Sequence, residues 1–284
     1  MNKQTFSLNW PGHSLDLGKR THVMGVLNVT PDSFSDGGLY FQKEKAIEHG
    51  LLLVQDGADI IDVGGESTRP FSEEVSLQEE LDRVVPVVEA LSKEVQVPIS
   101  IDTCKAEVAR RALKAGASII NDISALRFDP DIVSVAAEAG VPVILMHMQG
   151  TPGDMQKNPS YQNLIPEILD FLKRAVDRAV SGGIKNDLII VDPGIGFGKT
   201  VEHNLEVIRE LGQFRVLGRP VLLGTSNKTF IGQLLNKEPH DRDTGTMATI
   251  AAGVLNGANI VRVHNVKKAV ETVKIIDAIK TGKG

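Results

Sequence analysis

The sequence predicts an α/β protein folded as one closed (β/α)8 barrel, and three observations support that prediction. Short apolar runs alternate with longer stretches of helical spacing, and this alternation repeats eight times along the 284 residues. The runs are near-continuous in Val, Ile and Leu, which is typical of parallel strands buried on both faces. No second composition regime interrupts the repeat, so a single domain over residues 1–284 is expected. An open, doubly wound sheet is the alternative that this pattern leaves.

The predicted elements follow one another in a regular order from the first strand onward. The eight strands are expected at residues 22–28, 59–64, 98–103, 118–123, 142–147, 187–192, 220–225 and 259–264. Between them, apolar residues recur with the period of amphipathic helices. These helices are expected at residues 43–55, 77–95, 106–115, 130–139, 164–181, 203–211, 229–235 with 243–255, and 266–279. Glycines that precede the next strand predict left-handed helix caps, at Gly57, Gly116, Gly140 and Gly257.

Residues 5–19 precede the first strand and alternate apolar with polar side chains around Pro11-Gly12. This alternation is the pattern of a β-hairpin. We expect the hairpin, within residues 1–20, to close the bottom of a barrel formed by residues 21–284. Three longer stretches without periodicity each follow a strand directly, where the loops of a barrel tend to be functional: 30–42, 67–76 and 148–161.

The composition is that of an ordinary folded protein, with 24% charged and 42% hydrophobic residues. The formal net charge of -5 has the wrong sign for a nucleic-acid binder or a polybasic membrane-surface protein. No segment has the pattern of a signal peptide or an apolar run of ~18 residues. The single cysteine, Cys104, excludes an intramolecular disulfide and a multi-cysteine zinc site. We therefore expect a cytoplasmic protein with neither a nucleic-acid nor a membrane partner.

Polar side chains stand at the carboxyl end of every predicted strand, where barrel enzymes build their active sites. They are Asn28, Asp62, Asp102, Asn121 with Asp122, His147, Asp192, Ser226 with Lys228, and Arg262 with His264. Buried polar groups are costly unless they are paired, so each must meet another such group or a ligand. Single residues also have simpler interpretations. Asp62 or Asp122 could accept backbone N–H bonds from a neighbouring loop, and His147 is more typical of a hydrogen-bonded core histidine.

Taken as a set, these strand-end residues divide into two chemistries. One group accepts hydrogen bonds and the other is cationic: Asp102, Asn121 and Asp192 against Lys228, Arg262 and His264. Such a pair of groups favours a ligand with a donor-rich planar edge and an anionic tail. The glycine-rich residues 194–200 (GIGFGKT) lack the spacing of a P-loop or a dinucleotide fingerprint, and they predict a tight turn. Nothing beside Cys104 in the sequence would lower the pKa of its thiol, so a nucleophilic role is disfavoured.

Eight segments, in order and across essentially the whole barrel, carry a resemblance to one known family. They are GVLNVTPDSFSDGG at 25–38, IDVGGESTRP at 61–70, SIDT at 100–103, IINDI at 119–123, MHMQG at 146–150, DPGIGFGK at 192–199, GTSNKTFIG at 224–232 and RVHNV at 262–266. On these segments the chain resembles the dihydropteroate synthases, pterin-binding TIM-barrel transferases of folate biosynthesis. The resemblance implies condensation of 6-hydroxymethyl-7,8-dihydropterin diphosphate with 4-aminobenzoate, giving 7,8-dihydropteroate and pyrophosphate. It also implies Mg²⁺, sulfonamides as inhibitors that mimic the aminobenzoate, and a homodimer.

The resemblance assigns a role to each matching residue. It places the pterin at Asp102, Asn121, Asp192, Lys228 and Arg262 and the pyrophosphate at Asn28, Arg262 and His264. It places the aminobenzoate at Thr68, Arg69, Pro70, Ser226 and Lys228, and makes Asn28 the protein ligand of Mg²⁺. The catalytic residues would be Asp36, Asp102, Lys228 and Arg262. Two loops, 30–42 and 67–76, would bring Asp36, Thr68 and Arg69 over the site. We expect a dissociative reaction, because no side-chain nucleophile is present at the strand ends.

Three positions depart from the family pattern, and three other functions compete with the one it implies. Asn227 replaces the arginine of Ser-Arg-Lys, Asn265 replaces the final aspartate of Arg-Val-His-Asp, and Phe71 replaces the glycine after Thr-Arg-Pro. The departures would fit a non-catalytic pterin-binding paralogue. A methyltetrahydrofolate methyltransferase on the same barrel would not need a diphosphate pocket. An aldolase-type enzyme would use Lys228 as a Schiff base.

Overall fold

The computed structural model describes residues 6–30, 39–67 and 75–282. Within them, eight parallel strands form one sheet in the order β8-β7-β6-β5-β4-β3-β10-β9. The strands are β3 His22–Asn28, β4 Ile60–Gly64, β5 Ile99–Asp102, β6 Ile119–Asp122, β7 Val143–Met146, β8 Ile189–Asp192, β9 Leu222–Leu223 and β10 Ile260–Val263. A parallel bridge between Val191 and Val221 joins β8 to the start of β9 and closes the barrel. The predicted (β/α)8 fold is therefore confirmed, and the open sheet is excluded.

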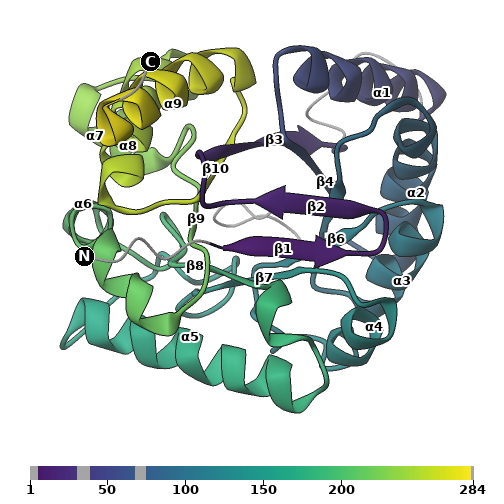
Figure 1. Ribbon diagram of the computed structural model, residues 1–284, viewed down its shortest axis with the longest axis horizontal. Coiled ribbons are helices and arrows are strands. Elements are labelled where there is room, and N and C mark those ends of the chain that lie inside the picture. The colour runs from purple at the N-terminus through teal and green to yellow at the C-terminus, as the bar shows by residue number, and fades with distance from the viewer. Residues whose placement is uncertain (1–5, 31–38, 68–74, 283–284) are drawn as a thin grey trace.

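Helices cover the outside of the barrel and alternate with its strands (Figure 1). In the described part of the chain they are α1 Leu39–Gln55, α2 Leu77–Glu94, α3 Ala106–Ala115, α4 Ile132–Ala139, α5 Leu164–Ser181, α6 Val201–Arg209, α7 Thr229–Leu235, α8 Asp243–Asn256 and α9 Val266–Thr281. Their apolar faces bury residues such as Val84, Val108 and Leu172 against the strands. The predicted glycine caps are confirmed, because Gly57, Gly116, Gly140 and Gly257 all have positive φ.

The hairpin predicted at the N-terminus is also present. Strands β1 (Ser7–Trp10) and β2 (His13–Asp16) pair antiparallel and cross one end of the barrel (Figure 1). The side chains of Leu8, Trp10 and Leu15 are buried beneath it. The amide of Asn259, which directly precedes β10, donates to the carbonyl of Leu17 at 3.4 Å. The hairpin therefore lies against the amino ends of the strands, as expected.

The structure differs from the predicted elements mainly near β9, the seventh of the eight barrel strands in chain order. Residues 220–225 were expected to be extended, but only Leu222–Leu223 form β9. Pro220 has no N–H to donate to the sheet, although its carbonyl accepts from the Val191 amide at 3.0 Å. Before it, Leu211–Leu217 form a 3-10 helix, η3, that no periodicity had indicated. None of the described helices combines the length and the apolar character that a membrane crossing needs.

The strand register brings the polar strand ends to the same level of the barrel. Gly64 pairs with Asp102, and Asp102 with Asn121, across β4, β5 and β6. Asn28 pairs with Gly64 on the other side of β4. Because all eight strands are parallel, their carboxyl ends open at one end of the barrel, which we call the mouth.

Candidate active site

Arg262 on β10 is the centre of the acidic half of the mouth. Its Nε donates to Asp62 Oδ2 at 2.6 Å, and its Nη2 donates to Asp102 Oδ2 at 2.7 Å. The amide of Asn121 donates to the same Asp62 oxygen at 3.0 Å. The Asp62 side chain is completely buried, and its Oδ1 has no hydrogen-bond partner in the described part of the chain. The structure thus joins β4, β5, β6 and β10 in one network that retains a free buried acceptor.

Burial makes the carboxylates of the mouth unusually basic. It raises the pKa of Asp102 to about 7, although the charge of Arg262 acts in the opposite direction. Burial also raises the pKa of Asp192 to about 6, although the hydrogen bond from the Gly194 amide and the charge of Lys228 act to lower it. The Gly194 amide donates to Asp192 Oδ1 at 2.7 Å. Both carboxyl groups can therefore change protonation near neutral pH, as acid–base groups of an active site do.

Lys228 forms a second, lysine half of the mouth with the glycine-rich turn after β8. Its ammonium lies 4.1 Å from the centroid of the Phe197 ring. Gly196 has φ +81, and a Cβ on it would lie 2.9 Å from the Cδ of Lys228. Burial and the charge of Arg262 lower the pKa of Lys228 to about 8, although Asp192 and Asp102 act to raise it. The predicted tight turn is confirmed, and its glycines allow the lysine to approach the backbone closely.

A second lysine of this half, Lys199, is not among the predicted site residues. Lys199 is buried, with 3% of its surface exposed, and its ammonium lies 2.9 Å from His147 Nδ1. It also donates to the carbonyls of Gly194 at 2.9 Å and Phe197 at 3.2 Å. Burial lowers the pKa of Lys199 to about 7. Lys199 belongs to the glycine-rich residues 194–200, whose pattern predicts only a turn, and nothing local in the sequence shows that its side chain points inward.

His147 and Asp122 have the simpler roles considered for strand-end residues. His147 is buried, and its burial together with Lys199 holds its pKa well below the usual range, so the core-histidine interpretation is confirmed. Asp122 accepts from the amides of Ser124 and Leu126, both at 2.7 Å, and so fixes the loop after β6. Cys104 donates to Asp122 at 3.1 Å, and burial raises the pKa of its thiol well above the usual value. Cys104 is therefore a poor nucleophile, as expected.

Asp62 does not have the loop-holding role that was considered for it. It pairs with Arg262 and Asn121 instead of with loop amides, and it belongs to the site although the predicted site residues omitted it. The sequence did mark Asp62 as polar within an apolar strand. Its partner is 200 residues away, so the pattern around Asp62 could not identify the pair.

Ser226 and His264 meet beside the two halves of the mouth. Ser226 Oγ lies 2.9 Å from His264 Nδ1, and the His264 amide donates to the same hydroxyl at 3.2 Å. His264 is exposed, Ser226 is buried, and Asn28 at the end of β3 is half-buried. The predicted residues Asp36, Thr68, Arg69 and Pro70 lie outside the described residues, as does Phe71.

Two departures from the family pattern have local structural reasons. Asn227 has a left-handed φ of +58, which asparagine tolerates better than most residues, and its carbonyl accepts from Arg242 at 2.9 Å. Asn265 caps α9 by accepting from the Lys268 amide at 3.2 Å. Its Nδ2 also donates to Asp243 at 2.8 Å, which an aspartate could not do. Asn265 therefore stabilises the segment after β10 rather than the ligand site.

Comparisons with known proteins agree with this geometry. The family described as pterin binding enzyme matches residues 24–264. The dihydropteroate synthase of Synechocystis sp. is 50% identical over 93% of this chain and 92% of its own length. Among solved structures, the dihydropteroate synthase of Yersinia pestis with a sulfonamide drug is 45% identical, with a TM-score of 0.92 over 98% of this chain and 100% of its own.

A dihydropteroate synthase of Xanthomonas albilineans in complex with 7,8-dihydropteroate is 40% identical, with a TM-score of 0.88. That similarity covers 96% of this chain and 98% of the other. Identity at this level across nearly whole chains shows common ancestry as well as a common fold. The chain therefore belongs to the pterin-binding enzyme family, and within that family to the dihydropteroate synthases.

Proposed function

We propose that this protein condenses 6-hydroxymethyl-7,8-dihydropterin diphosphate with 4-aminobenzoate to form 7,8-dihydropteroate and pyrophosphate. One observation carries the proposal: Arg262 joins Asp62 and Asp102 at 2.6 and 2.7 Å at the mouth, close enough to Lys228 and Asp192 for their charges to act on one another. This arrangement offers acceptors to a ring and cations to an anion at one end of the barrel. The relatives named above are dihydropteroate synthases, which favours this activity over methyl transfer.

The pterin ring would lie between the two halves of the mouth, against Asp102, Asn121, Asp192, Lys228 and Arg262. The pyrimidine edge of a pterin carries an amino group and a ring N–H. A carboxylate that accepts from two parallel donors makes a strong pair and rejects rings that lack them. Asp192 keeps Oδ2 for such a pair, since only its Oδ1 is bonded to Gly194 in the described residues. The unpartnered Oδ1 of Asp62 supplies a further buried acceptor.

The diphosphate would lie at Asn28, Arg262 and His264. Arg262 uses Nε and Nη2 on carboxylates, and its Nη1 has no hydrogen bond to the described residues. No group of three His, Cys, Asp or Glu side chains among the described residues could hold a metal. The single amide oxygen of half-buried Asn28 fits Mg²⁺, which commonly keeps water and substrate phosphates as its other ligands. When bound, Mg²⁺ would neutralise charge on the leaving pyrophosphate.

The aminobenzoate would border Ser226 and Lys228, together with the Thr68, Arg69 and Pro70 segment outside the described residues. Sulfonamides would compete there as mimics of the aminobenzoate. Asp36 would act from the first loop, which also lies outside the described residues. Within the described part, the Ser226–His264 contact of 2.9 Å places a hydroxyl beside the cationic groups of the mouth.

The reaction needs charge separation at one carbon–oxygen bond. As the bond from the pterin methylene carbon to the diphosphate breaks, both electrons leave with pyrophosphate and a cation spreads into the ring. The carboxylates Asp102 and Asp192 stabilise that cation, while Arg262 and His264 receive the anion. The arylamine nitrogen then attacks the methylene carbon and loses its proton to solvent or pyrophosphate. The buried, high-pKa thiol of Cys104 takes no part.

Purified protein supplied with both substrates and Mg²⁺ tests the activity directly. We expect stoichiometric 7,8-dihydropteroate and pyrophosphate, with product formation lost when the aminobenzoate is omitted. A protein that binds the pterin diphosphate but forms no product is the non-catalytic paralogue. Borohydride should trap no adduct on Lys228, whereas a trapped adduct would indicate Schiff-base chemistry.

We also infer that the protein acts in the cytoplasm as a homodimer and that its 284 residues make one domain. Exposed apolar side chains gather on α7, α8 and α9 and support the homodimer: Leu234, Leu235, Leu255, Ile275 and Ile279. Light scattering after size-exclusion chromatography should give twice the chain mass of 30.7 kDa. A single-chain mass at all concentrations would contradict the dimer.

A further inference from the structure

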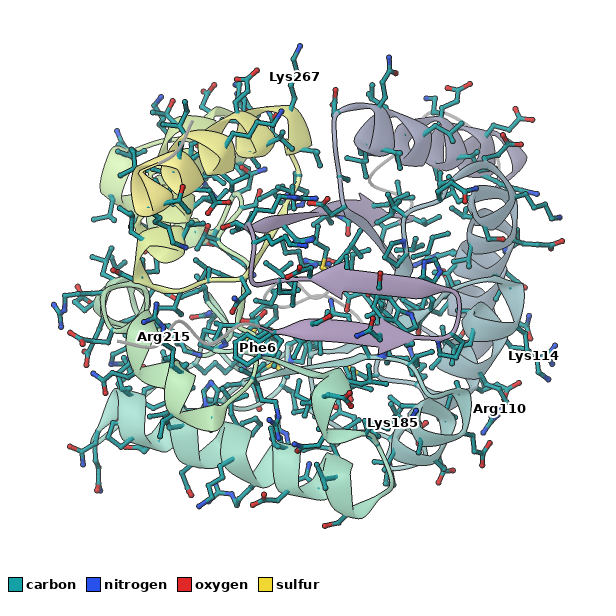
Figure 2. All side chains as sticks on the ribbon, in the orientation of Figure 1. Phe6, Arg110, Lys114, Lys185, Arg215 and Lys267 are labelled. Carbon is teal, nitrogen blue, oxygen red and sulfur yellow. The ribbon has the colours of Figure 1, made fainter. Side chains whose placement is uncertain are left out.

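A cavity lies at the end of the barrel opposite to the mouth. It has a volume of about 770 Å³, and the residues directly before β3, β9 and β10 line it, namely Thr21, Val221 and Asn259. Phe6 and Leu17 beside the hairpin form one wall. Figure 2 labels Phe6 and Arg215, which both line the cavity and face the viewer on the hairpin side. The predicted site residues and the family resemblance assign no function to this cavity.

The lining has more basic than acidic side chains, although three of the basic ones have carboxylate partners: Lys19 with Asp16, Arg20 with Asp59, and Lys280 with Asp277 at 3.9 Å. Five basic side chains line the cavity against one acidic side chain: Lys19, Arg20, Arg215, Arg219 and Lys280 against Asp277. The acidic group is already engaged, because Asp277 accepts from the Thr21 amide at 2.6 Å and from its hydroxyl at 2.9 Å. An excess of positive charge in a concave site attracts anions, even on a protein whose net charge is -5.

Two of these basic residues have donors that no described residue uses. Arg219 donates Nη1 to the Gly218 carbonyl at 2.7 Å and Nη2 to the Asn186 amide oxygen, but its buried Nε has no partner. Arg215 makes no hydrogen bond or ion pair through its guanidinium with the described residues, and it packs against Gly257. By contrast, Arg20 is bonded to Asp59 and Lys19 to Asp16. Burial lowers the pKa of Arg219, so a bound anion would stabilise its charge.

The same cavity also has an apolar wall. Leu17 and Val221 are buried in its floor, and Phe6 is half-buried beside them. Val216 is 77% exposed, the highest fraction among the large apolar side chains of the described residues. Apolar surface next to unsatisfied guanidinium donors is what a ligand with an apolar body and an anionic head would cover.

We propose that this cavity binds a small organic anion, with its acidic head on Arg215 and Arg219 and an aromatic body against Phe6 and Val216. The head can be a phosphate, a carboxylate or a sulfonate, because each accepts several guanidinium N–H groups. The proposal does not depend on the proposed catalytic function, because the cavity lies at the amino ends of the strands and the mouth at their carboxyl ends.

The test uses 8-anilinonaphthalene-1-sulfonate, an aromatic sulfonate that fluoresces when bound, on the full chain. We expect saturable binding at one site per chain, unchanged by saturating 7,8-dihydropteroate at the mouth. Arg215→Ala and Arg219→Ala should each raise the Kd about 10-fold, since each removes a hydrogen bond between charged groups. Phe6→Ala should also weaken binding. The matched control is Lys185→Ala, because Lys185 is exposed and does not line the cavity (Figure 2).

The outcomes separate the proposal from general dye binding. Equal affinity in Arg215→Ala and wild type, or displacement by 7,8-dihydropteroate, would overturn it. Arg215 is exposed, so its variant should fold even where Arg219→Ala does not. AMP and 2-naphthoate as competitors then show whether the cavity prefers a phosphate or a carboxylate. If neither displaces the dye at millimolar concentration, the proposal is contradicted.

Discussion

The two halves of the mouth hold their charges in different ways. In the acidic half, Asp62 and Asp102 have direct ionic partners on Arg262, at 2.6 and 2.7 Å. In the lysine half, Lys228 faces an aromatic ring, and Lys199 faces carbonyls and an imidazole. Charges of the first kind hold one another in place. In the lysine half, burial lowers the pKa of Lys228 to about 8 and that of Lys199 to about 7, and neither ammonium has a bonded carboxylate among the described residues.

The largest effect is expected from breaking the acidic half at Arg262. Arg262→Ala leaves the buried Asp62 and the partly buried Asp102 without their cation, and the loss of one partner costs about 3–5 kcal/mol in buried pairs. Urea denaturation should show that loss in the free energy of unfolding. Lys228→Ala should change the free energy of unfolding far less, because no carboxylate among the described residues is bonded to its ammonium. Equal losses in the two variants would remove the distinction between the halves.

The next effect is expected on catalysis, where both halves are needed. Asp192→Ala and Lys228→Ala should each lower kcat/KM on the order of 100-fold or more, because each removes a charged contact to the ligand. Thermal unfolding curves serve as the control for folding. Near-normal rates in either variant, measured as 7,8-dihydropteroate formed, would contradict the assignment of the site.

A smaller effect is expected from the buried lysine behind the lysine half. Lys199→Met removes the donor that holds the carbonyls of Gly194 and Phe197, so the Phe197 ring loses its fixed place beside Lys228. We expect KM for the pterin substrate to rise about 10-fold with a smaller change in kcat. Lys199→Arg should recover part of the loss. A fall in kcat with unchanged KM would argue against a positioning role.

The smallest effect is expected outside the mouth, at Asn265. Asn265→Asp keeps the cap of α9 but places a second carboxylate against Asp243, where Nδ2 now donates at 2.8 Å. We expect a loss of about 0.5–1 kcal/mol in the free energy of unfolding and kcat/KM within about twofold of wild type. A large gain in kcat/KM would contradict this prediction and would mean that Asn265 limits the activity.

Most of the fold was predictable because its signals are local in the sequence. Parallel strands buried on both faces appear as apolar runs, and glycine caps such as Gly116 mark where helices end. The strand at residues 220–225 was predicted, but its reduction to Leu222–Leu223 was not, because Pro220 lacks an N–H for the neighbouring strand, and the sequence does not show which strand that is. The 3-10 helix Leu211–Leu217 has no periodic pattern to indicate it.

The sequence predicted which strand ends carry the site residues, but not which of these residues bond to one another. The rule that sites form at carboxyl ends of strands indicated Asp102, Asn121 and Arg262, which the structure brings into one network. The Asp62 and Lys199 contacts join residues 200 and 52 positions apart, so they depend on the closed barrel. Local spacing cannot show such contacts.

The pH dependence of kcat/KM tests the central claim, that the carboxylates and the lysine half of the mouth act together on one substrate. Asp192, with its pKa raised to about 6, must be ionised to accept from the ring, so kcat/KM should rise with pH through about 6. Lys228, with its pKa lowered to about 8, must stay protonated, so kcat/KM should fall above about 8. Asp192→Asn should remove the part of the rise near 6 and leave the part near 7 that belongs to Asp102, and Lys228→Ala should remove the fall. A profile with the same two limbs in wild type and both variants would contradict the account.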